Sequence, residues 1–540
     1  MQTKYVVILG SLMSGLGKGV VTSSLLKLFD FYDYKALPIK FDGYLNFDSG
    51  TMNPFQHGEV FVLDDKSEVD MDFGIYERFL GKSLTGDLSI TGGKLFGSII
   101  SKERKGSYLG ETVQIIPHVT DQIIKNVEKV AADKKPDVLV IEVGGTVGDI
   151  ENSYFIEAMR QLALKHEVVF INLTYLPTLD VVGEQKTKPA QIGFRLLLQD
   201  GIRANFIICR SSTKLLESTK EKLALFANLT KDRIIDDQDQ ATLYNLPLHF
   251  MDLGFDKLLL GDLGLRAGRP SLQKVSEWKK NVERTVRPKG NVNIAIVGKY
   301  THLKDSYASV KEAVIHAASR HDVRANIDWI ESSDFEKGSD FGRISNADAV
   351  IVTGGFGKRG TEGMIKIIEH ARSKKIPYLG LCLGMQLMAV EYARNVAGLK
   401  DANSTEFKLD TKNKIIVLLD SQKRITNKGG TMRLGAQECV LADKQSIAYG
   451  AYHSKRISER HRHRYEFNNQ YLELLKKNGL KITGTTPDRS LVEFIEWKDS
   501  FGVATQSHPE LKSRFESPAP LFVSLINAAK ERRKERLAEK

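Results

Sequence analysis

Two short stretches hold residue types and spacings that could do chemistry, and each follows an apolar run that predicts a buried strand. In "YVVILGSLMSGLGKGVVTSSLL", Gly15, Gly17 and Gly19 surround Lys18 ahead of a helical pattern. Glycines let the backbone approach phosphate oxygens, and the N–H groups of a helix start add to the positive potential of the lysine. We interpret this stretch as a phosphate-binding loop. A tight turn with a surface lysine accounts less well for three glycines within five residues.

The loop departs from the GxxxxGK[ST] pattern, because Leu12 holds the first position and Gly19 follows Lys18. The hydroxyl that usually helps to hold Mg²⁺ is missing, so carboxylates must contribute more. Glu142 ends the apolar run "DVLVIE", at the strand end where open α/β sheets place their ligands. Asp72 lies in the acid-rich "DDKSEVDMDFG", where a lone acid is usually only solvated. Glu142 and Asp72 are the candidate metal ligands.

The second stretch is "IPYLGLCLGMQLMAVEYA", in which residues 380–384 read Gly-Leu-Cys-Leu-Gly. A strand, this pentapeptide and a helix reproduce the nucleophile elbow G-x-S-x-G with Cys382 as the nucleophile. The turn is expected to project the sulfur into solvent beside a helix N-terminus, where the thiolate is favoured. Cys209 in "FIICRS" and Cys439 in "QECVLA" fit better as small buried hydrophobic residues.

A cysteine nucleophile needs a general base, and the base needs an orienting acid. The segment "VATQSHPEL" supplies His508 and Glu510. If it is a strand end, residues two apart point to the same side and these two can meet. The oxyanion donors are expected to be the backbone N–H groups of Leu383 and of Gly355 in "TGGFGKRG".

Composition excludes several classes of protein. No apolar run approaches the roughly 20 residues that span a membrane, and no signal-peptide pattern is seen, so we expect a cytoplasmic protein. Three cysteines are an odd number without paired spacing, which argues against a disulfide framework or a zinc site. The net charge of +11 favours nucleic acid or small phosphorylated ligands. The basic residues are dispersed apart from "KERRKERLAEK", which we interpret as a solvated helix end, so no nucleic-acid partner is predicted.

Apolar runs that predict buried strands alternate with helical stretches along the chain, from "YVVILG" and "DVLVIEVGG" to "VNIAIVGKY" and "IPYLGLC". This alternation predicts an α/β fold class, with a mostly parallel sheet flanked by helices in each of two domains. A polar stretch with Pro270 and Pro288 separates the two sets of runs. We predict domains over residues 1–270 and 291–540, joined by a linker over 271–290 with one short amphipathic helix.

Longer stretches resemble the CTP synthase family over most of the chain. The matching motifs include "GTMNPFQHGEVFV", "KERKGSYLGETVQIIPH", "EVGGTVGDIE", "GEQKTKP", "GLCLGMQ", "NSTEF", "GGTMRLGAQ" and "ERHRHRYE". The N-terminal half is similar to a P-loop-like, dethiobiotin-synthetase-like amidoligase domain. The C-terminal half is similar to a class I (triad) glutamine amidotransferase. The family's loop also has Gly after Lys, so the unusual loop is the family's own variant.

The resemblance implies that ATP phosphorylates O4 of UTP, and that ammonia from glutamine hydrolysis travels internally and displaces the phosphate to give CTP. It implies Mg²⁺ held by the acids that match Asp72 and Glu142, activation by GTP and feedback inhibition by CTP. It also implies a homotetramer, with filaments left open, and neither a membrane nor a nucleic-acid partner.

The resemblance also implies site residues. Those that match the ATP site are Gly15, Leu16, Gly17, Lys18, Gly19, Val20, Asp72 and Arg210. Those that match the UTP and CTP sites are Ser14, Lys40, Asp149, Ile150, Glu151, Lys186, Thr187, Lys188, Pro189, Ala190, Gln191 and Lys222. Those that match the glutamine site are Gly355, Leu383, Gly384, Met385, Gln386, Glu406 and Arg464. Arg433, in the lid segment 429–435, is expected to bind an anion near the GTP site, and His57 and Val60 match the gate of the ammonia passage.

The chain departs from the family pattern at a few positions. Gly43 and Ser49 stand where Pro is usual and are expected to loosen the loop after Lys40, while Ala190 lies in an altered nucleotide segment and Ser507 replaces an aromatic residue before the base.

Three alternatives stay open. The first is another ATP-dependent amidase of the same plan, which "GEQKTKP" and "GTMNPFQHGEV" disfavour. The second is a scaffold or filament protein, which the complete set of predicted catalytic groups disfavours as a sole function. The third treats "ERHRHRYEF" as a basic patch for nucleic acid, although so short a strip adds little specificity.

Overall fold

The computed structural model describes residues 2–179, 183–338, 340–419, 422 and 429–538. The chain forms two compact units, Met1–Asp48 with Ile75–Val282 and Ser49–Gly74 with Glu283–Lys540. Residues 49–74 thus fold with the C-terminal unit, so no single domain boundary in the sequence separates the two units. The α/β fold class predicted from the alternating runs is confirmed in both units.

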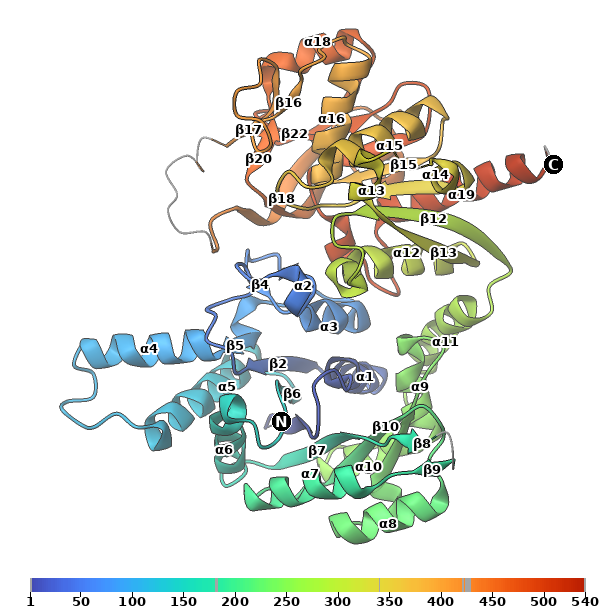
Figure 1. Ribbon diagram of the computed structural model, residues 1–540. Helices are drawn as coiled ribbons and strands as arrows, with labels where there is room; N and C mark the ends of the chain where they lie inside the picture. The colour runs from blue at the N-terminus through green and yellow to red at the C-terminus, as the bar shows by residue number, and fades with distance from the viewer. Residues whose placement is uncertain (1, 180–182, 339, 420–421, 423–428, 539–540) are drawn as a thin grey trace. The chain divides into compact units, whose positions relative to one another are not determined.

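Among the described residues, the first unit contains a parallel sheet of seven strands in the order β11-β10-β7-β1-β6-β2-β5 (Figure 1). The strands are β1 Lys4–Gly10, β2 Ala36–Asp42, β5 Ser89–Thr91, β6 Val138–Val143, β7 Val168–Tyr175, β10 Phe206–Ser211 and β11 Ile234–Gln238. The central strands are buried on both faces, as their continuous apolar runs predict. Because β2 lies on one side of β1 and β7 on the other, the carboxyl end of β1 forms a topological switch point.

Helices flank this sheet. They are α1 Lys18–Phe31, α4 Gly92–Arg104, α5 Thr120–Lys134, α6 Ser153–Leu162, α7 Lys188–Gln199, α8 Glu217–Ala227, α9 Leu246–Asp252, α10 Phe255–Asp262 and α11 Leu272–Val286; α3 covers Asp72–Leu80, and β8 Thr178–Leu179 pairs with β9 Glu184–Gln185. The helix expected in the linker is α11, and it carries part of the core of this unit. Its Trp278 is fully buried, and the indole N–H donates to the Tyr244 carbonyl at 2.7 Å.

The described part of the second unit contains a mixed sheet of nine strands in the order β13-β12-β14-β15-β23-β22-β21-β18-β19. The first five strands in this order, β13, β12, β14, β15 and β23, are parallel. The last four, β22, β21, β18 and β19, continue the sheet in antiparallel pairings. The strands are β12 Gly290–Gly298, β13 Val323–Glu331, β14 Ala349–Val352, β15 Tyr378–Leu381, β18 Arg433–Leu441, β19 Arg456–His463, β21 Lys481–Thr485, β22 Val492–Glu496 and β23 Gly502–Thr505. Smaller pairings join β16 Asn403–Ser404, β17 Lys414–Leu418 and β20 Tyr465–Phe467, and β3 Phe61–Val62 with β4 Glu68–Val69.

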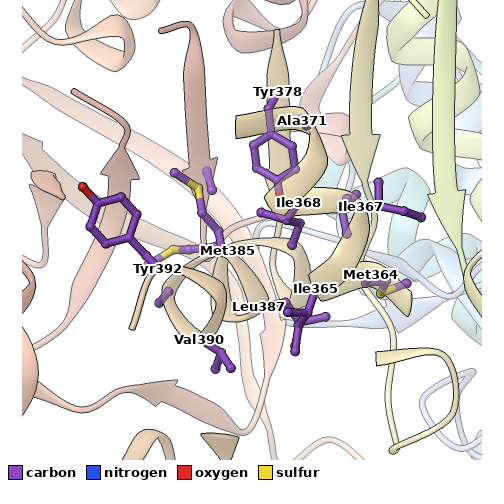
Figure 2. Packing of buried hydrophobic residues seen from close by; sticks show 14 of the residues in the cluster. Met364, Ile365, Ile367, Ile368, Ala371, Tyr378, Met385, Leu387, Val390 and Tyr392 are labelled. Carbon is purple, nitrogen blue, oxygen red and sulfur yellow. The ribbon is translucent and has the colours of Figure 1, made fainter. Parts of the chain in front are cut away.

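Two apolar cores cover the two faces of this sheet. Side chains of a strand alternate between faces, so Val350 and Val352 of β14 join one core while Ala349 and Ile351 join the other. The first core includes α15 Thr361–Ser373 and α16 Leu383–Asn395, whose isoleucine, leucine and valine side chains pack together in Figure 2. The second includes α12 Ala308–Arg320 and α19 Pro520–Ala538. The remaining helices of this unit are α2 Pro54–His57, α13 Ser332–Glu336, α14 Gly342–Asn346, α17 Ile447–Tyr452 and α18 Leu472–Lys477.

The basic C-terminal tail is not simply a solvated helix end, and the expectation was wrong for two of its arginines. Arg533 and Arg536 of α19 each donate to the buried carboxylate of Asp348 at 3.1 Å. The same carboxylate accepts from the backbone N–H of Asn293 at 2.8 Å. A buried charge must be paired, so Asp348 fixes the helix to the sheet.

We expect Asp348→Asn to lower the thermal midpoint of unfolding, because the isosteric amide cannot pair with two guanidinium groups. The loss should correspond to about 1.5–3 kcal/mol, the range for hydrogen bonds to charged groups. Differential scanning calorimetry measures the shift. Glu535→Gln, an exposed carboxylate on the same helix, is the matched control, and equal midpoints for the two variants would contradict the anchoring role.

Candidate active sites

The glycine-rich loop joins β1 to α1 in the first unit. Leu12 has φ of 83°, so it adopts the left-handed conformation that the consensus glycine would supply at this position. Gly15 and Gly17 also have positive φ, and Gly17 is the N-cap residue of α1 without a side-chain cap. Lys18 is buried, and its Nζ donates to the Gly145 carbonyl after β6 at 2.6 Å. Leu12 therefore adopts the backbone conformation for which the consensus pattern has glycine.

This loop lines a pocket together with Arg210. The lining residues are Gly15, Leu16, Gly17, Val20, Arg210, Asp237, Gln240, Leu243 and Leu246. Sequence reasoning missed the last four, although Asp237 lies at the carboxyl end of β11, where a ligand residue is expected. Arg210 pairs with Asp237 at 3.2 Å and Asp239 at 2.7 Å. Burial raises the pKa of Asp237 to about 6, although Arg210 opposes the shift.

Glu142, the candidate metal ligand at the end of β6, is buried and fully hydrogen-bonded. It accepts from Lys40 Nζ at 2.8 Å, from Thr22 Oγ1 at 2.9 Å and from the Tyr76 hydroxyl. Among the described residues, no cluster of three or more His, Cys, Asp or Glu side chains could hold a metal ion alone. A single carboxylate still fits Mg²⁺, which is commonly bound through one or two carboxylates plus substrate phosphates. Asp72, the second candidate, begins α3.

The residues matched to the pyrimidine nucleotide are spread over several elements of the first unit, and one of them, Lys40, lies on β2. Residues 186–191 lead into α7 and begin it, and the Gln191 amide donates to Thr187 Oγ1 at 3.0 Å. Lys222 is exposed on α8, and Ser14 is exposed in the glycine-rich loop. Residues 149–151 follow β6; the Asp149 carboxylate accepts from the Thr146 backbone N–H at 2.9 Å, and Ile150 and Glu151 are exposed.

The loop near Gly43 is tightly packed, contrary to the expected loosening. A Cβ atom at Gly43 would lie 2.4 Å from the Glu151 carbonyl oxygen, so only glycine permits this approach.

In the second unit, Cys382 lies between β15 and α16, as the elbow pattern predicts. Its backbone is strained, with φ of 51° and ψ of −99°. A Cβ atom at Gly384 would lie 2.2 Å from the Val352 carbonyl oxygen, which explains the glycine of the pentapeptide. The side chain is 5% exposed and lines a cavity, so the expectation that sulfur projects into solvent was wrong.

His508 and Glu510 also line this cavity. The His508 Nδ1 atom lies 2.7 Å from Glu510 Oε1. The pair does not arise from strand alternation, because β23 ends at Thr505 and Glu510 lies in a short 3-10 turn over Pro509–Lys512. Burial alone would lower the pKa of His508, but the negative charges of Glu510 and the Cys382 thiolate raise it well above its usual value.

The cavity wall also contains Gly355, which was expected at the oxyanion position, and the neighbouring Gly354. The lining residues are Pro54, Glu59, Val60, Tyr300, Ser306, Tyr307, Val310, Gly354, Gly355, Phe356, Cys382, Arg462, His508, Glu510 and Leu511. A Cβ atom at Gly354 would lie 3.0 Å from the His508 ring, so the glycine loop touches the imidazole. Leu383 is the first residue of α16, and its N–H therefore has no acceptor within the helix.

Sequence reasoning missed Gln506, which lies two residues before His508 in the same motif. Its amide Nε2 donates to Cys382 Sγ at 3.5 Å. Gln386 Nε2 in turn donates to Gln506 Oε1 at 3.2 Å and to the Tyr465 carbonyl at 3.0 Å. The Gln386 amide thus positions the Gln506 amide, which in turn donates to the Cys382 sulfur.

Glu406 and Arg464, the two charged residues matched to glutamine recognition, lie close to the phenol of Tyr465. Glu406 accepts from the Gly357 N–H at 2.7 Å, and Arg464 donates to Gln422 at 2.7 Å and Thr431 at 3.2 Å. Burial and the charge of Glu406 raise the pKa of Tyr465, and Arg464 opposes the shift. Glu406 and Arg464 thus place a negative and a positive charge near the same tyrosine.

Arg433, which was expected to bind an anion near the GTP site, is paired with two carboxylates of its own unit. It begins β18 and is largely buried, and it donates to Glu466 at 3.0 Å and to Glu493 at 2.6 Å. Its charge is already matched by two buried carboxylates. Burial raises the pKa of Glu466; Arg433 opposes the shift and the like charge of Glu493 adds to it.

Residues 49–74 supply part of the cavity wall and are fixed by ion pairs within the second unit. Val60 lines the cavity that contains Cys382, whereas His57 ends α2 and is exposed. The buried Arg460 donates to Asp64 at 2.6 Å, and Arg462 donates to Glu68 at 2.8 Å. These contacts bind N-terminal sequence to the cysteine site.

Comparison with known proteins identifies the family. A profile described as CTP synthase N-terminus matches residues 4–265, and one described as glutamine amidotransferase class-I matches residues 302–528. The chain is 49% identical to the CTP synthase of Carboxydothermus hydrogenoformans over 98% of both chains. It is 48% identical to that of Sulfolobus acidocaldarius over 98% of this chain and 99% of the relative. The chain belongs to the CTP synthase family.

The family is that of glutamine-hydrolysing ligases, and the predicted resemblance is confirmed over almost the whole chain. Among solved structures, the glutaminase domain of Trypanosoma brucei CTPS with bound acivicin aligns at 36% identity and a TM-score of 0.42, over 44% of this chain and 94% of that one. Within the described part of the chain, no helix combines the length and apolar character needed to cross a bilayer.

We expect Glu510→Gln to slow alkylation of Cys382 by iodoacetamide at neutral pH by about tenfold or more, since each unit of pKa corresponds to tenfold. Glu510 raises the pKa of His508, so its removal lets the imidazolium lose its proton at lower pH and weakens its pairing with the thiolate. The rate of thiol modification against pH measures this effect. Glu516→Gln removes an exposed carboxylate nearby, and a similar rate in both variants would disprove the role of Glu510.

Proposed function

We propose that this chain converts UTP to CTP, using ATP to activate the pyrimidine and glutamine as the source of nitrogen. One observation carries the proposal. Val60 and Glu59, from sequence that precedes most of the nucleotide unit, line the cavity that contains Cys382, His508 and Glu510. Sequence from the N-terminal half of the chain thus helps to close the cavity of the cysteine site, which supports two reactions linked in one chain. Membership in the CTP synthase family agrees with the two linked reactions.

In the glutaminase reaction, His508 holds the proton of Cys382, and the thiolate attacks the side-chain amide of glutamine. The N–H groups of Leu383 and Gly355 stabilise the oxyanion of the tetrahedral intermediate. His508 then gives its proton to the amide nitrogen, which leaves as ammonia, and water hydrolyses the thioester to release glutamate. Glu510 keeps the imidazole oriented through the 2.7 Å contact, and Gln506 orients the sulfur.

Two charged residues select free glutamine. The Glu406 carboxylate pairs with the α-ammonium group and the Arg464 guanidinium with the α-carboxylate. Gly384, Met385 and Gln386, at the start of α16, support the side chain of the substrate. Peptide-bound glutamine lacks both charges and is expected to be rejected.

In the synthetase reaction, the γ-phosphoryl group of ATP transfers to O4 of UTP, and ADP leaves. Ammonia attacks C4, and inorganic phosphate departs with the former carbonyl oxygen. The loop over residues 15–20 and Lys18 hold the ATP phosphates, and Arg210 lies at the wall of the same pocket. Lys40 offsets the charge that moves between the two nucleotides. Mg²⁺, with Glu142 and Asp72 as its protein ligands, would neutralise further phosphate charge.

The pyrimidine nucleotide is assigned to Ser14, residues 186–191 and Lys222, with Asp149, Ile150 and Glu151 recognising CTP as a feedback inhibitor. The ammonia passage begins at Val60, with His57 on the same segment. Activation by GTP, the homotetramer and a cytoplasmic location stay predictions. The internal pairing of Arg433 argues that it acts by holding the base of the lid rather than by binding GTP directly.

Product analysis tests the proposal. Purified protein is mixed with UTP, ATP, Mg²⁺, GTP and glutamine, and a parallel reaction contains ammonium in place of glutamine. CTP in both reactions supports the two linked sites. Glutamate release without CTP in either reaction would indicate another acceptor and favour a related amidase, and no turnover of any substrate would favour a scaffold.

We expect Cys382→Ala to abolish glutamine-dependent CTP formation, with a loss of at least about a thousandfold, because the nucleophile is removed. The reaction with ammonium should be spared, since it bypasses the glutaminase site. CTP formation from each nitrogen source measures the effect. Loss of both activities would contradict the division into two sites.

Lys18→Ala is the complementary variant. It should lower CTP formation from both nitrogen sources by about a hundredfold or more, because it removes a charge from the phosphate site. Basal glutamate release should persist. Full activity with ammonium would disprove the assigned role of Lys18 in phosphoryl transfer.

A further inference from the structure

Lys299 is a buried lysine that neither the sequence motifs nor the proposed reaction uses. It follows β12, at the carboxyl end of the parallel part of the sheet, and is 1% exposed. Its backbone is fixed on both sides, because its N–H donates to the Tyr307 hydroxyl at 2.9 Å and its carbonyl accepts from Arg359. The ammonium group therefore extends from a rigid base.

The ammonium group of Lys299 binds the loop that carries Gly355. Its Nζ donates to the carbonyl of Phe356 at 3.3 Å and to the carbonyl of Gly357. The stem of the lysine packs under the loop as well, since a Cβ atom at Gly355 would lie 3.3 Å from Lys299 Cδ. Lysine and loop are thus in direct contact over three consecutive residues.

Glu406 binds the same loop from the opposite end of one peptide group. The Phe356 carbonyl and the Gly357 N–H belong to a single peptide unit, and they point in opposite directions because the peptide is planar and trans. Lys299 binds the carbonyl at 3.3 Å and Glu406 Oε1 accepts from the N–H at 2.7 Å. A rotation of this peptide would break both contacts at once.

We propose that Lys299 is a positioning residue for glutamine hydrolysis: with Glu406 it clamps the Phe356–Gly357 peptide and so fixes the oxyanion loop over residues 354–357. The inference rests on the proposed glutaminase reaction. It links substrate recognition to catalysis, because Glu406, which is assigned to the α-ammonium group of glutamine, also accepts from the Gly357 N–H. Lys299 keeps the loop in place while Glu406 is shared between the loop and the substrate.

The charges around Lys299 support this role. Burial lowers the pKa of Lys299 to about 8; Glu406, Glu331 and Glu336 oppose this shift and Arg359 adds to it. Burial raises the pKa of Glu406, and the Gly357 N–H and the charge of Lys299 oppose that shift. Loss of the lysine charge therefore leaves a buried carboxylate with less compensation.

The test uses the full-length protein and the variant Lys299→Met, which keeps the length of the side chain but removes its charge and donors. We expect kcat for glutamate release to fall about tenfold or more, below the effect of deleting an oxyanion donor, with KM changed less than about threefold. Alkylation of Cys382 by iodoacetamide should be unchanged, because it needs the thiolate but no oxyanion hole. CTP formation from ammonium should also be unchanged. Lys400→Met, at an exposed site, is the matched control.

The pH profile gives a readout that a merely structural role would not change. The wild-type kcat for glutamate release should decline as pH rises through about 8, where Lys299 loses its proton, and the Lys299→Met variant should lack that decline. A wild-type and variant profile of the same shape would overturn the inference.

Three further outcomes would also overturn it. These are an unchanged kcat, a raised KM alone, and a parallel loss of alkylation that shows damage to the nucleophile itself. Failure of the proposed function is separable, because wild-type protein would then release no glutamate at all. In that case the proposed role of Lys299 would be disproved together with the proposed reaction.

Discussion

Both candidate sites depend on the start of a helix that follows a buried parallel strand. Gly17 and Cys382 are the N-cap residues of α1 and α16; both have positive φ, and neither caps its helix through its side chain. A helix start without a side-chain cap leaves its first N–H groups to bind an anion. In one unit the anion is expected to be phosphate, and in the other the thiolate and the oxyanion. The strands hold these helix starts in place because they are buried on both faces.

Strand periodicity explains how the second unit uses the basic run in β19. Arg460 and Arg462 pair with Asp64 and Glu68, whereas the intervening His461 contacts His463 at 2.9 Å. Burial and the positive charge of Arg433 hold the pKa values of both histidines well below normal, so they stay neutral. The run therefore sorts charged side chains to one face and neutral ones to the other. Its arginine charges are matched inside the unit, which argues against a nucleic-acid patch.

The sequence predicted what local patterns determine and missed what distant segments determine. Apolar runs predicted the buried strands, and glycine spacing predicted both turns, because these depend on a few consecutive residues. The pairing of residues 49–74 with the cysteine unit could not be predicted, since Asp64 and Arg460 are 396 residues apart. The ion pairs of Arg433 could not be predicted for the same reason, because its partners Glu466 and Glu493 lie on other strands. Lys299 carried no motif, and its significance depends on which carbonyl groups surround its ammonium group.

If ammonia leaves the cavity past Val60, as proposed, the ion pairs of residues 49–74 hold the wall of its passage. Ammonia is small and neutral, so a passage can retain it only through close apolar walls that are held in place. Glu68 accepts from Arg462 at 2.8 Å and from the Gly430 N–H at 3.2 Å, so one carboxylate joins the cavity wall to the lid segment. Arg462 itself lines the cavity beside Cys382. The Glu68 carboxylate thus connects residues 429–435 directly with Arg462 in the cavity wall.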